Sequence, residues 1–104
     1  MSQRIIVLFN LQAGKSKADY ENWARTKDIP GVNGLGSVDN FEVFRADSLL
    51  FSDDSSPYDY IEILDINDMD AFGQDASQAH MQAIAAEFQG EIAKDLVFIN
   101  VSKL

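Results

Sequence analysis

The chain has 104 residues, of which 46% are hydrophobic and 11% aromatic, so we expect one folded domain over residues 1–104 rather than disorder. Its 17 Asp and Glu against 8 Lys and Arg give a net charge of −9, which argues against nucleic acids and anionic membrane surfaces as partners. The absence of cysteine excludes disulfides and thiolate chemistry, and a cytoplasmic location is the default expectation.

The first elements in chain order are a strand and a helix. Residues 4–11 are rich in β-branched and aromatic side chains and too few for a stable helix, which is typical of a strand. Ser16 is a suitable N-cap for a helix, with Asp19 as the acidic residue of a capping-box-like pattern. We expect this helix to end near Lys27, because Pro30 disfavours helical geometry in the residue before it.

A glycine-rich loop and a second strand come next. The glycines are typical of turn residues, and their order and position do not fit a phosphate-binding loop; they are Gly31, Gly34 and Gly36. Residues 38–46 predict a strand on which Phe41, Val43 and Arg45 share one face, opposite Glu42 and Phe44.

The second half repeats this order after a polar, acidic connection at residues 51–57. Residues 58–66 predict a third strand, and Asp68 is expected to cap a short turn that stops at Gly73. Asp75, with Gln78 three residues later, predicts the start of a second long helix.

That helix carries an apolar stripe at helical spacing, formed by Met81, Ile84, Ala85 and Phe88. It ends at Gly90 or extends to Ile92, and residues 96–101 form a last strand. The order β-α-β-β-α-β indicates an α+β, ferredoxin-like domain with both helices on one face of a four-stranded antiparallel sheet.

Three of the strands are apolar on both faces, although two helices can cover only one face. One example is the first strand, where Ile6 and Leu8 oppose Ile5, Val7 and Phe9. An uncovered apolar sheet of this size exceeds what monomers usually expose. We therefore expect a homodimer in which two sheets pack face to face as a dimeric α/β barrel.

Several tracts resemble the REDY-like proteins of the HapK and PigK type, in the dimeric α/β barrel superfamily. They are IIVLFNLQAG, YENWARTKDIPGVNGLGSVDNFEVFRA, SPYDYIEILDINDMDAF and FINV, which together run nearly end to end. The resemblance implies a role in prodigiosin-like red pigment biosynthesis, in the branch that makes a methoxy-bipyrrole carbaldehyde. It does not decide between catalysis and binding of an intermediate.

His80, the only histidine, is the candidate catalytic acid or base, although a partly solvated residue at the edge of the helix stripe is the more ordinary interpretation. One histidine and no cysteine leave only carboxylates as further metal ligands, so the case for a metal site is weak. The acidic run at residues 65–70 also lacks the glycine and distal glutamate of a calcium loop. We expect no metal and no cofactor.

Polar groups inside otherwise apolar strands suggest a ligand pocket; they are Asn10, Arg45, Glu62 and Asn100. Arg45 and Glu62 lie on adjacent strands, so a cross-strand ion pair is the simpler explanation. Alternatively, such groups orient a polar heterocycle in a cavity whose aromatic walls are Trp23, Phe41, Tyr58 and Tyr60. In that case we expect Trp23 and Arg45 to line one cavity, with its entrance at the glycine loop after Pro30.

The sequence thus favours a homodimeric accessory protein that binds a small aromatic, pyrrolic ligand. A cofactor-free oxygenase or isomerase that uses His80 is the alternative. A third possibility is a protein whose apolar sheet face binds another pathway enzyme in place of a second copy.

Overall fold

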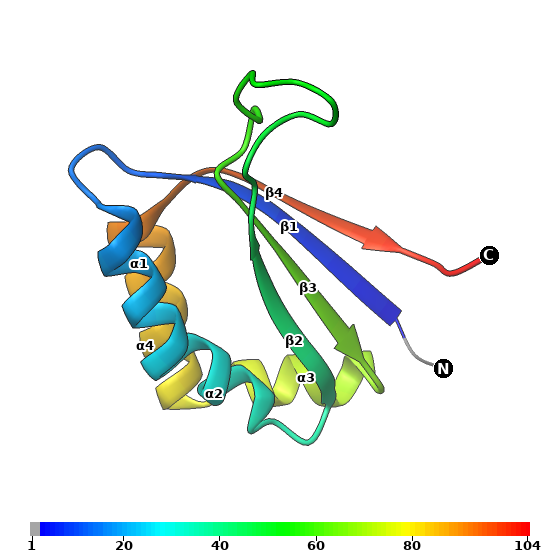
Figure 1. Cartoon of the computed structure of the whole chain (residues 1–104). Helices are drawn as coiled ribbons and strands as arrows, with labels where there is room; N and C mark the ends of the chain where they lie inside the picture. Colours follow the sequence, from blue (N-terminus) through cyan, green and yellow to red (C-terminus); the bar gives the residue numbers. More distant parts are fainter. Residues whose placement is uncertain (1–2) are drawn as a thin grey trace.

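The structure is a computed structural model that describes residues 3–104, so the first two residues of the expected domain lie outside the described part. Its four strands are β1 (Gln3–Leu11), β2 (Val38–Arg45), β3 (Tyr60–Ile66) and β4 (Ala93–Val101). They form one antiparallel sheet in the order β2-β3-β1-β4, with α1, α2 and α4 on one side (Figure 1). This confirms the ferredoxin-like α+β fold, and the strand bounds differ from the predicted ones by three residues at most.

The first helical stretch is longer than the sequence indicated. It consists of α1 (Lys17–Trp23), a π-helical turn (Ala24–Asp28) and α2 (Ile29–Asn33). The amide of Asp19 donates to Ser16 Oγ at 3.0 Å, which confirms the predicted N-cap. The predicted end near Lys27 is wrong. The π-turn places Pro30 in the first turn of α2, where a missing amide costs nothing, so proline starts this helix instead of stopping the previous one.

This extension also corrects the role of one glycine. Gly31 lies within α2, not in a loop, and a Cβ placed there would lie 2.8 Å from the Ile84 Cδ1 atom of α4. The glycine therefore permits a close approach between the two helices. Only Gly34, which caps α2, and Gly36 belong to the turn that leads into β2.

The second helical stretch consists of two helices, and the longer one, α4, begins later than predicted. Asp68 caps α3 (Met69–Ala76) by accepting from the Ala71 amide at 3.1 Å, and α3 continues past Gly73. The predicted start at Asp75 is wrong, because this carboxylate accepts a 2.7 Å bond from Ser37 Oγ and so ties α3 to the residue before β2. α4 (Ala79–Glu87) follows, and a π-helical turn (Phe88–Ile92) extends the helix past Gly90, as the apolar stripe allowed.

Aromatic rings dominate the core between helices and sheet. Phe9 of β1 is fully buried, and its ring packs edge-on against Tyr20 and Phe88 and stacks on Tyr60. The Phe41, Val43 and Arg45 face of β2 turns towards the helices, as the alternation allowed, because Phe41 is buried and Arg45 bonds a residue of α1.

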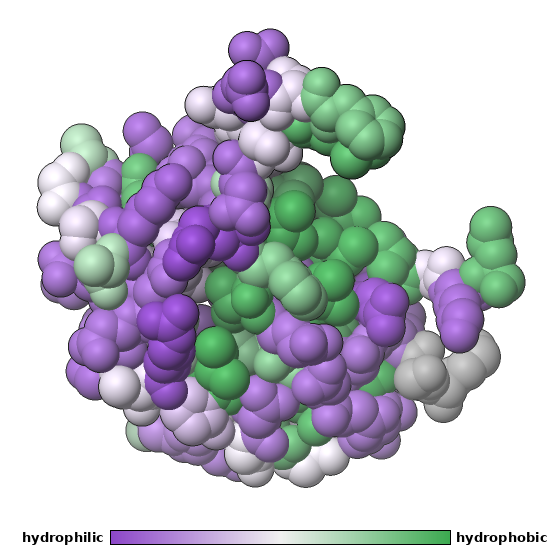
Figure 2. All heavy atoms as spheres, viewed as in Figure 1, coloured by the Kyte–Doolittle hydropathy of each residue, from purple (hydrophilic) through white to green (hydrophobic). Residues whose placement is uncertain are grey.

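The opposite face of the sheet carries apolar side chains, and no helix of residues 3–104 covers it. Cross-strand pairs hold them together, with Ile6 beside Ile63 and Ile99, and Leu8 beside Ile61 and Val97. We call these six residues the outer apolar face. Figure 2 shows hydrophobic atoms gathered over the strands below the loop of residues 46–59, and more of them on that loop. The loop exposes three apolar side chains in a row, namely Leu49, Leu50 and Phe51.

Candidate functional site: a cavity with a buried carboxyl pair

A cavity of about 200 Å³ lies between the helices and the inner face of the sheet. Most of its lining is apolar and comes from both layers, including Val7, Phe41 and Leu64 of the strands and Met81 and Phe88 of the helical layer. Its exposed lining residues are Ala85, Gln89 and Phe98, which places the opening between the end of α4 and β4. The entrance expected at the glycine loop is therefore wrong, because no glycine lines this cavity.

Two acidic side chains, Asp28 and Glu62, contribute the polar part of the lining together with Gln89. Both are 5% exposed, so each carboxyl group is almost entirely removed from bulk water. The two carboxyl groups lie close enough to influence each other, and neighbouring carboxyls removed from water favour a state in which they share one proton. Asp28 precedes α2 but its side chain caps no amide of that helix, so the carboxyl is free to face the cavity.

Burial is the main cause of the unusual acidity of this pair. It raises the pKa of Asp28, and it raises the pKa of Glu62 well above its ordinary value, where the neighbouring Asp28 charge adds to the effect. Within residues 3–104, no basic side chain forms an ion pair with either carboxyl. Two carboxyls without a cation can stay buried together only if they share a proton.

Tyr20 lies close to this pair. Its hydroxyl is buried and has no hydrogen-bond partner among the described residues. Burial raises the pKa of Tyr20 far above its ordinary value, and the nearby carboxyls of Glu62 and Asp28 contribute to the same shift. The hydroxyl therefore stays protonated and remains an unused donor beside two acid groups.

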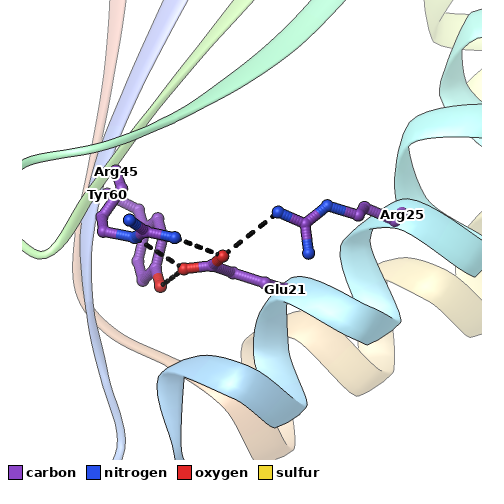
Figure 3. A network of polar contacts seen from close by, with 4 residues as sticks. All are labelled: Glu21, Arg25, Arg45 and Tyr60. Atoms are coloured by element: carbon purple, nitrogen blue, oxygen red, sulfur yellow. Dashed lines mark hydrogen bonds and ion pairs between the residues drawn. The ribbon is translucent and has the colours of Figure 1, made fainter.

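A second, smaller hollow of about 120 Å³ is lined by Tyr20 and by Glu21 of α1, whose carboxylate receives three partners (Figure 3). Arg45 donates through Nε at 2.8 Å and Nη2 at 2.6 Å, and the Tyr60 hydroxyl donates at 2.6 Å. Arg25, one helical turn along, donates at 3.3 Å. The predicted pair of Arg45 with Glu62 is thus wrong, because Arg45 lies opposite Tyr60 and Glu62 lies opposite Val43.

These contacts fix the charges in the second hollow. The Arg45 guanidinium and then the Tyr60 hydroxyl lower the pKa of Glu21 to about 2. Burial, followed by the hydrogen bond to Glu21, raises the pKa of Tyr60 to about 12. The network therefore keeps an ionised carboxylate and a protonated phenol at neutral pH, and it ties α1 to β2 and β3.

The residues that the sequence singled out are divided between different places. Glu62 and Phe41 line the cavity, whereas Arg45 and Tyr60 line the second hollow. Trp23 lines neither; its ring stacks on Phe88 at 6.2 Å, and its Nε1 donates to Glu87 at 2.8 Å. The shared cavity expected for Trp23 and Arg45 is therefore not present in the described part of the chain.

His80 and Asn10 lie elsewhere. His80 is exposed in the first turn of α4 and lines neither hollow. Asn10 supports the base of the loop of residues 46–59, since its side chain donates to the Pro57 carbonyl at 3.2 Å and accepts from the Asp59 amide at 2.9 Å.

Sequence reasoning missed Asp28, Tyr20 and Glu21. Tyr20, Ala24 and Asp28 recur at four-residue spacing, and this periodicity places them on one buried helical face. The signal was hidden because the proline appeared to end the helix before Asp28 could belong to that face.

Among residues 3–104, no group of three or more His, Cys, Asp or Glu side chains is placed to hold a metal ion. Over the same residues, no helix has the length and apolar character needed to span a membrane.

The fold is similar to that of several solved structures. HapK from Hahella chejuensis gives a TM-score of 0.79 at 26% identity, over 100% of this chain and 93% of that chain. The Arabidopsis thaliana protein At3g17210 gives 0.78 at 15% identity, over 98% and 95% of the two chains. A dimeric ferredoxin-like protein of unknown function from Thermobifida fusca gives 0.72 at 17% identity, over 99% and 92%. Because the last two proteins have low sequence identity to this chain, their similarity shows the fold alone.

No protein among the curated ones matches the sequence. The sequence profile of one family, described as REDY-like protein HapK, matches residues 3–104. This match covers nearly the whole chain and agrees with the similarity to the HapK structure. It confirms the resemblance seen in the sequence tracts: the chain belongs to the REDY-like HapK family.

Proposed function

We propose that this protein binds a small pyrrolic intermediate of prodigiosin-like pigment biosynthesis, in the branch that makes the methoxy-bipyrrole carbaldehyde. The single observation that carries the proposal is the apolar cavity between helices and sheet, with the carboxyl groups of Asp28 and Glu62 in its wall. Membership of the HapK family supports the pathway.

The lining of the cavity fits this class of ligand. Phe41, Phe72, Phe88 and Phe98 provide flat apolar surfaces, and only a few polar groups interrupt them. Small-molecule sites are usually apolar with a few convergent polar groups, and sites for drug-sized ligands measure about 300–1,000 Å³. The cavity here is smaller, at about 200 Å³, which suits one or two small rings.

We also propose that the protein is a homodimer whose subunits meet through the outer apolar face. Ile99 on this face is 40% exposed, and Phe44, which pairs with Ile61 of the same face, is 44% exposed. A second sheet packed on this face would bury both side chains. The loop that carries Phe51 overhangs this side of the sheet (Figure 2) and could extend over the partner. The similar Thermobifida fusca protein is described as dimeric, which supports the same assembly.

An enzyme of the same pathway, a cofactor-free oxygenase or isomerase, is the second candidate. The observation that favours it is the buried pair of Asp28 and Glu62 in the cavity wall, because buried carboxyls with raised pKa values are typical of acid–base groups. His80 was the sequence candidate for this role, but its exposed position outside the cavity makes the carboxyl pair the better one.

Titration with 2,2′-bipyrrole-5-carbaldehyde tests the proposal, with Trp23 fluorescence as the readout. Trp23 lies outside the cavity but stacks on Phe88, which lines it, so an occupied cavity should alter its emission. Analysis of the recovered ligand by mass spectrometry distinguishes binding from turnover. Unaltered ligand supports the accessory role, and a product supports the enzyme.

Two variants of α4 locate the binding site. Ala85 and Ala83 are both exposed on this helix, but only Ala85 lines the cavity. Ala85→Phe should narrow the opening and weaken binding at least tenfold, whereas Ala83→Phe should bind like the parent protein. Equal binding by both variants would place the ligand elsewhere and overturn the proposed site.

A further inference from the structure

The carboxyl pair in the cavity wall lacks the partners that buried acids normally have. Asp28 and Glu62 are each 5% exposed, and none of the ion pairs formed within residues 3–104 involves either one. The side chain of Asp28 does not cap α2. Two carboxyl groups offer several acceptor positions, and the one proton between them satisfies only part of these.

Acceptors left unsatisfied in an apolar cavity cost free energy, so a ligand that supplies a donor gains from binding here. The Tyr20 hydroxyl does not line the cavity and has no hydrogen-bond partner among the described residues, so it does not supply this donor. Apart from Gln89 at the rim, the remaining lining is apolar and includes four phenylalanine rings. The donor must therefore sit on a mainly apolar, flat molecule.

We propose that the carboxyl pair of Asp28 and Glu62 is the recognition group of this cavity and selects planar aromatic ligands that carry a ring N–H. This proposal rests on the cavity being the ligand site, as proposed above. A ring N–H is a donor without a lone pair directed into the site, as in indole. A hydroxyl would bring acceptor lone pairs of its own to a wall that already has an excess of acceptors.

The pair differs in this respect from the second hollow. There the Glu21 carboxylate already receives Arg45, Tyr60 and Arg25, so its acceptor positions are occupied by the protein. A ligand donor would have to displace an arginine at Glu21, but it meets free acceptors at Asp28 and Glu62. The carboxyl pair, and not Glu21, is therefore the group that can accept a hydrogen bond from a ligand.

The test compares two ligands of the same shape, 2,2′-bipyrrole-5-carbaldehyde and 2,2′-bifuran-5-carbaldehyde, in which oxygen replaces each N–H. The parent protein should bind the bipyrrole at least tenfold more tightly by isothermal titration calorimetry. Glu62→Gln keeps the size of the side chain but replaces one acidic oxygen with an amide donor. It should lose most of the preference for the bipyrrole, and Asp28→Asn should act in the same direction.

Glu91→Gln is the matched control, because Glu91 is exposed and lines neither hollow; it should keep the preference. Circular dichroism checks that each variant is folded. If the parent protein binds both ligands equally and Ala85→Phe weakens both, the cavity remains the site but the recognition role of the carboxyl pair is overturned. If neither ligand binds, this inference and the proposed function both fail.

Discussion

The Tyr60 hydroxyl donates a 2.6 Å hydrogen bond to Glu21 Oε2 and so connects the centre of the sheet to the first helix. Tyr60 is 1% exposed, and Glu21 is held at the same time by Arg45. Tyr60 and Glu21 both line the smaller hollow and neither lines the cavity that holds Asp28 and Glu62.

Tyr60→Phe should lower the free energy of unfolding by about 1–2 kcal/mol, since a hydrogen bond to a charged acceptor is lost while the ring packing stays. Urea denaturation measures the change. Tyr58→Phe is the control, because Tyr58 forms a hydrogen bond through its amide and, among the described residues, none through its hydroxyl. Equal stability of Tyr60→Phe and the parent protein would show that the bond contributes nothing.

Glu21 should make the protein sensitive to acid. Its pKa is lowered from 4.5 to about 2 by Arg45 first and Tyr60 second, so the unfolded state binds the proton more readily. The resulting stability is present above pH 4.5 and is lost as the pH falls towards 2. Glu21→Gln should be less stable at neutral pH and lose less stability over that acid range. Melting temperatures measured between neutral pH and pH 2 test this, and parallel curves for the two proteins would contradict it.

The carboxyl pair should have the opposite effect. Burial raises the pKa values of Asp28 and Glu62 from 3.8 and 4.5, so here the folded state binds the proton more readily. The stability that the pair contributes is fully present when the pH is below the ordinary pKa values. It is lost as the pH rises through the raised pKa values of the folded state. Glu62→Gln should therefore lose less stability than the parent protein between pH 5 and pH 9, because its amide can donate to an ionised Asp28.

Thermal melts over that pH range measure the difference, with Glu91→Gln as the exposed control. A second readout is the infrared band of a protonated carboxylic acid at neutral pH. The parent protein should show this band and the Asp28→Asn, Glu62→Gln double variant should not. A parent protein without it would mean that the pair does not retain a proton.

The outer apolar face should hold two subunits together. Ile99→Lys places a charge on this face and should convert a dimer into a monomer, because an unpaired charge cannot be buried between two sheets. Light scattering coupled to size exclusion measures the mass. Asn100→Lys, at the next residue of β4 and on the other face, should leave the dimer intact. A monomeric parent protein would contradict the proposed assembly.

The order of strands and helices could be predicted from the sequence because it depends on local patterns. Alternating or β-branched runs marked the strands. Ser16 marked the start of a helix and Asp68 that of a short turn, and the structure confirms both caps, although the turn is the longer helix α3. The apolar character of both faces of β1 was also evident from alternation alone, since neighbouring strand residues point to opposite faces.

The site depended on relationships that no local pattern contains. The π-turn at Ala24–Asp28 carries the helix into Pro30 and places Asp28 beside Glu62, although the two residues lie far apart in the sequence. The strand register also decides the partner of Arg45. Arg45 lies opposite Tyr60 in the sheet, and it therefore pairs with Glu21 and not with Glu62. The sequence by itself determined the order of the strands and helices, and the strand bounds to within three residues. Only the tertiary structure decided which charges meet, because burial and proximity come from packing and not from spacing along the chain.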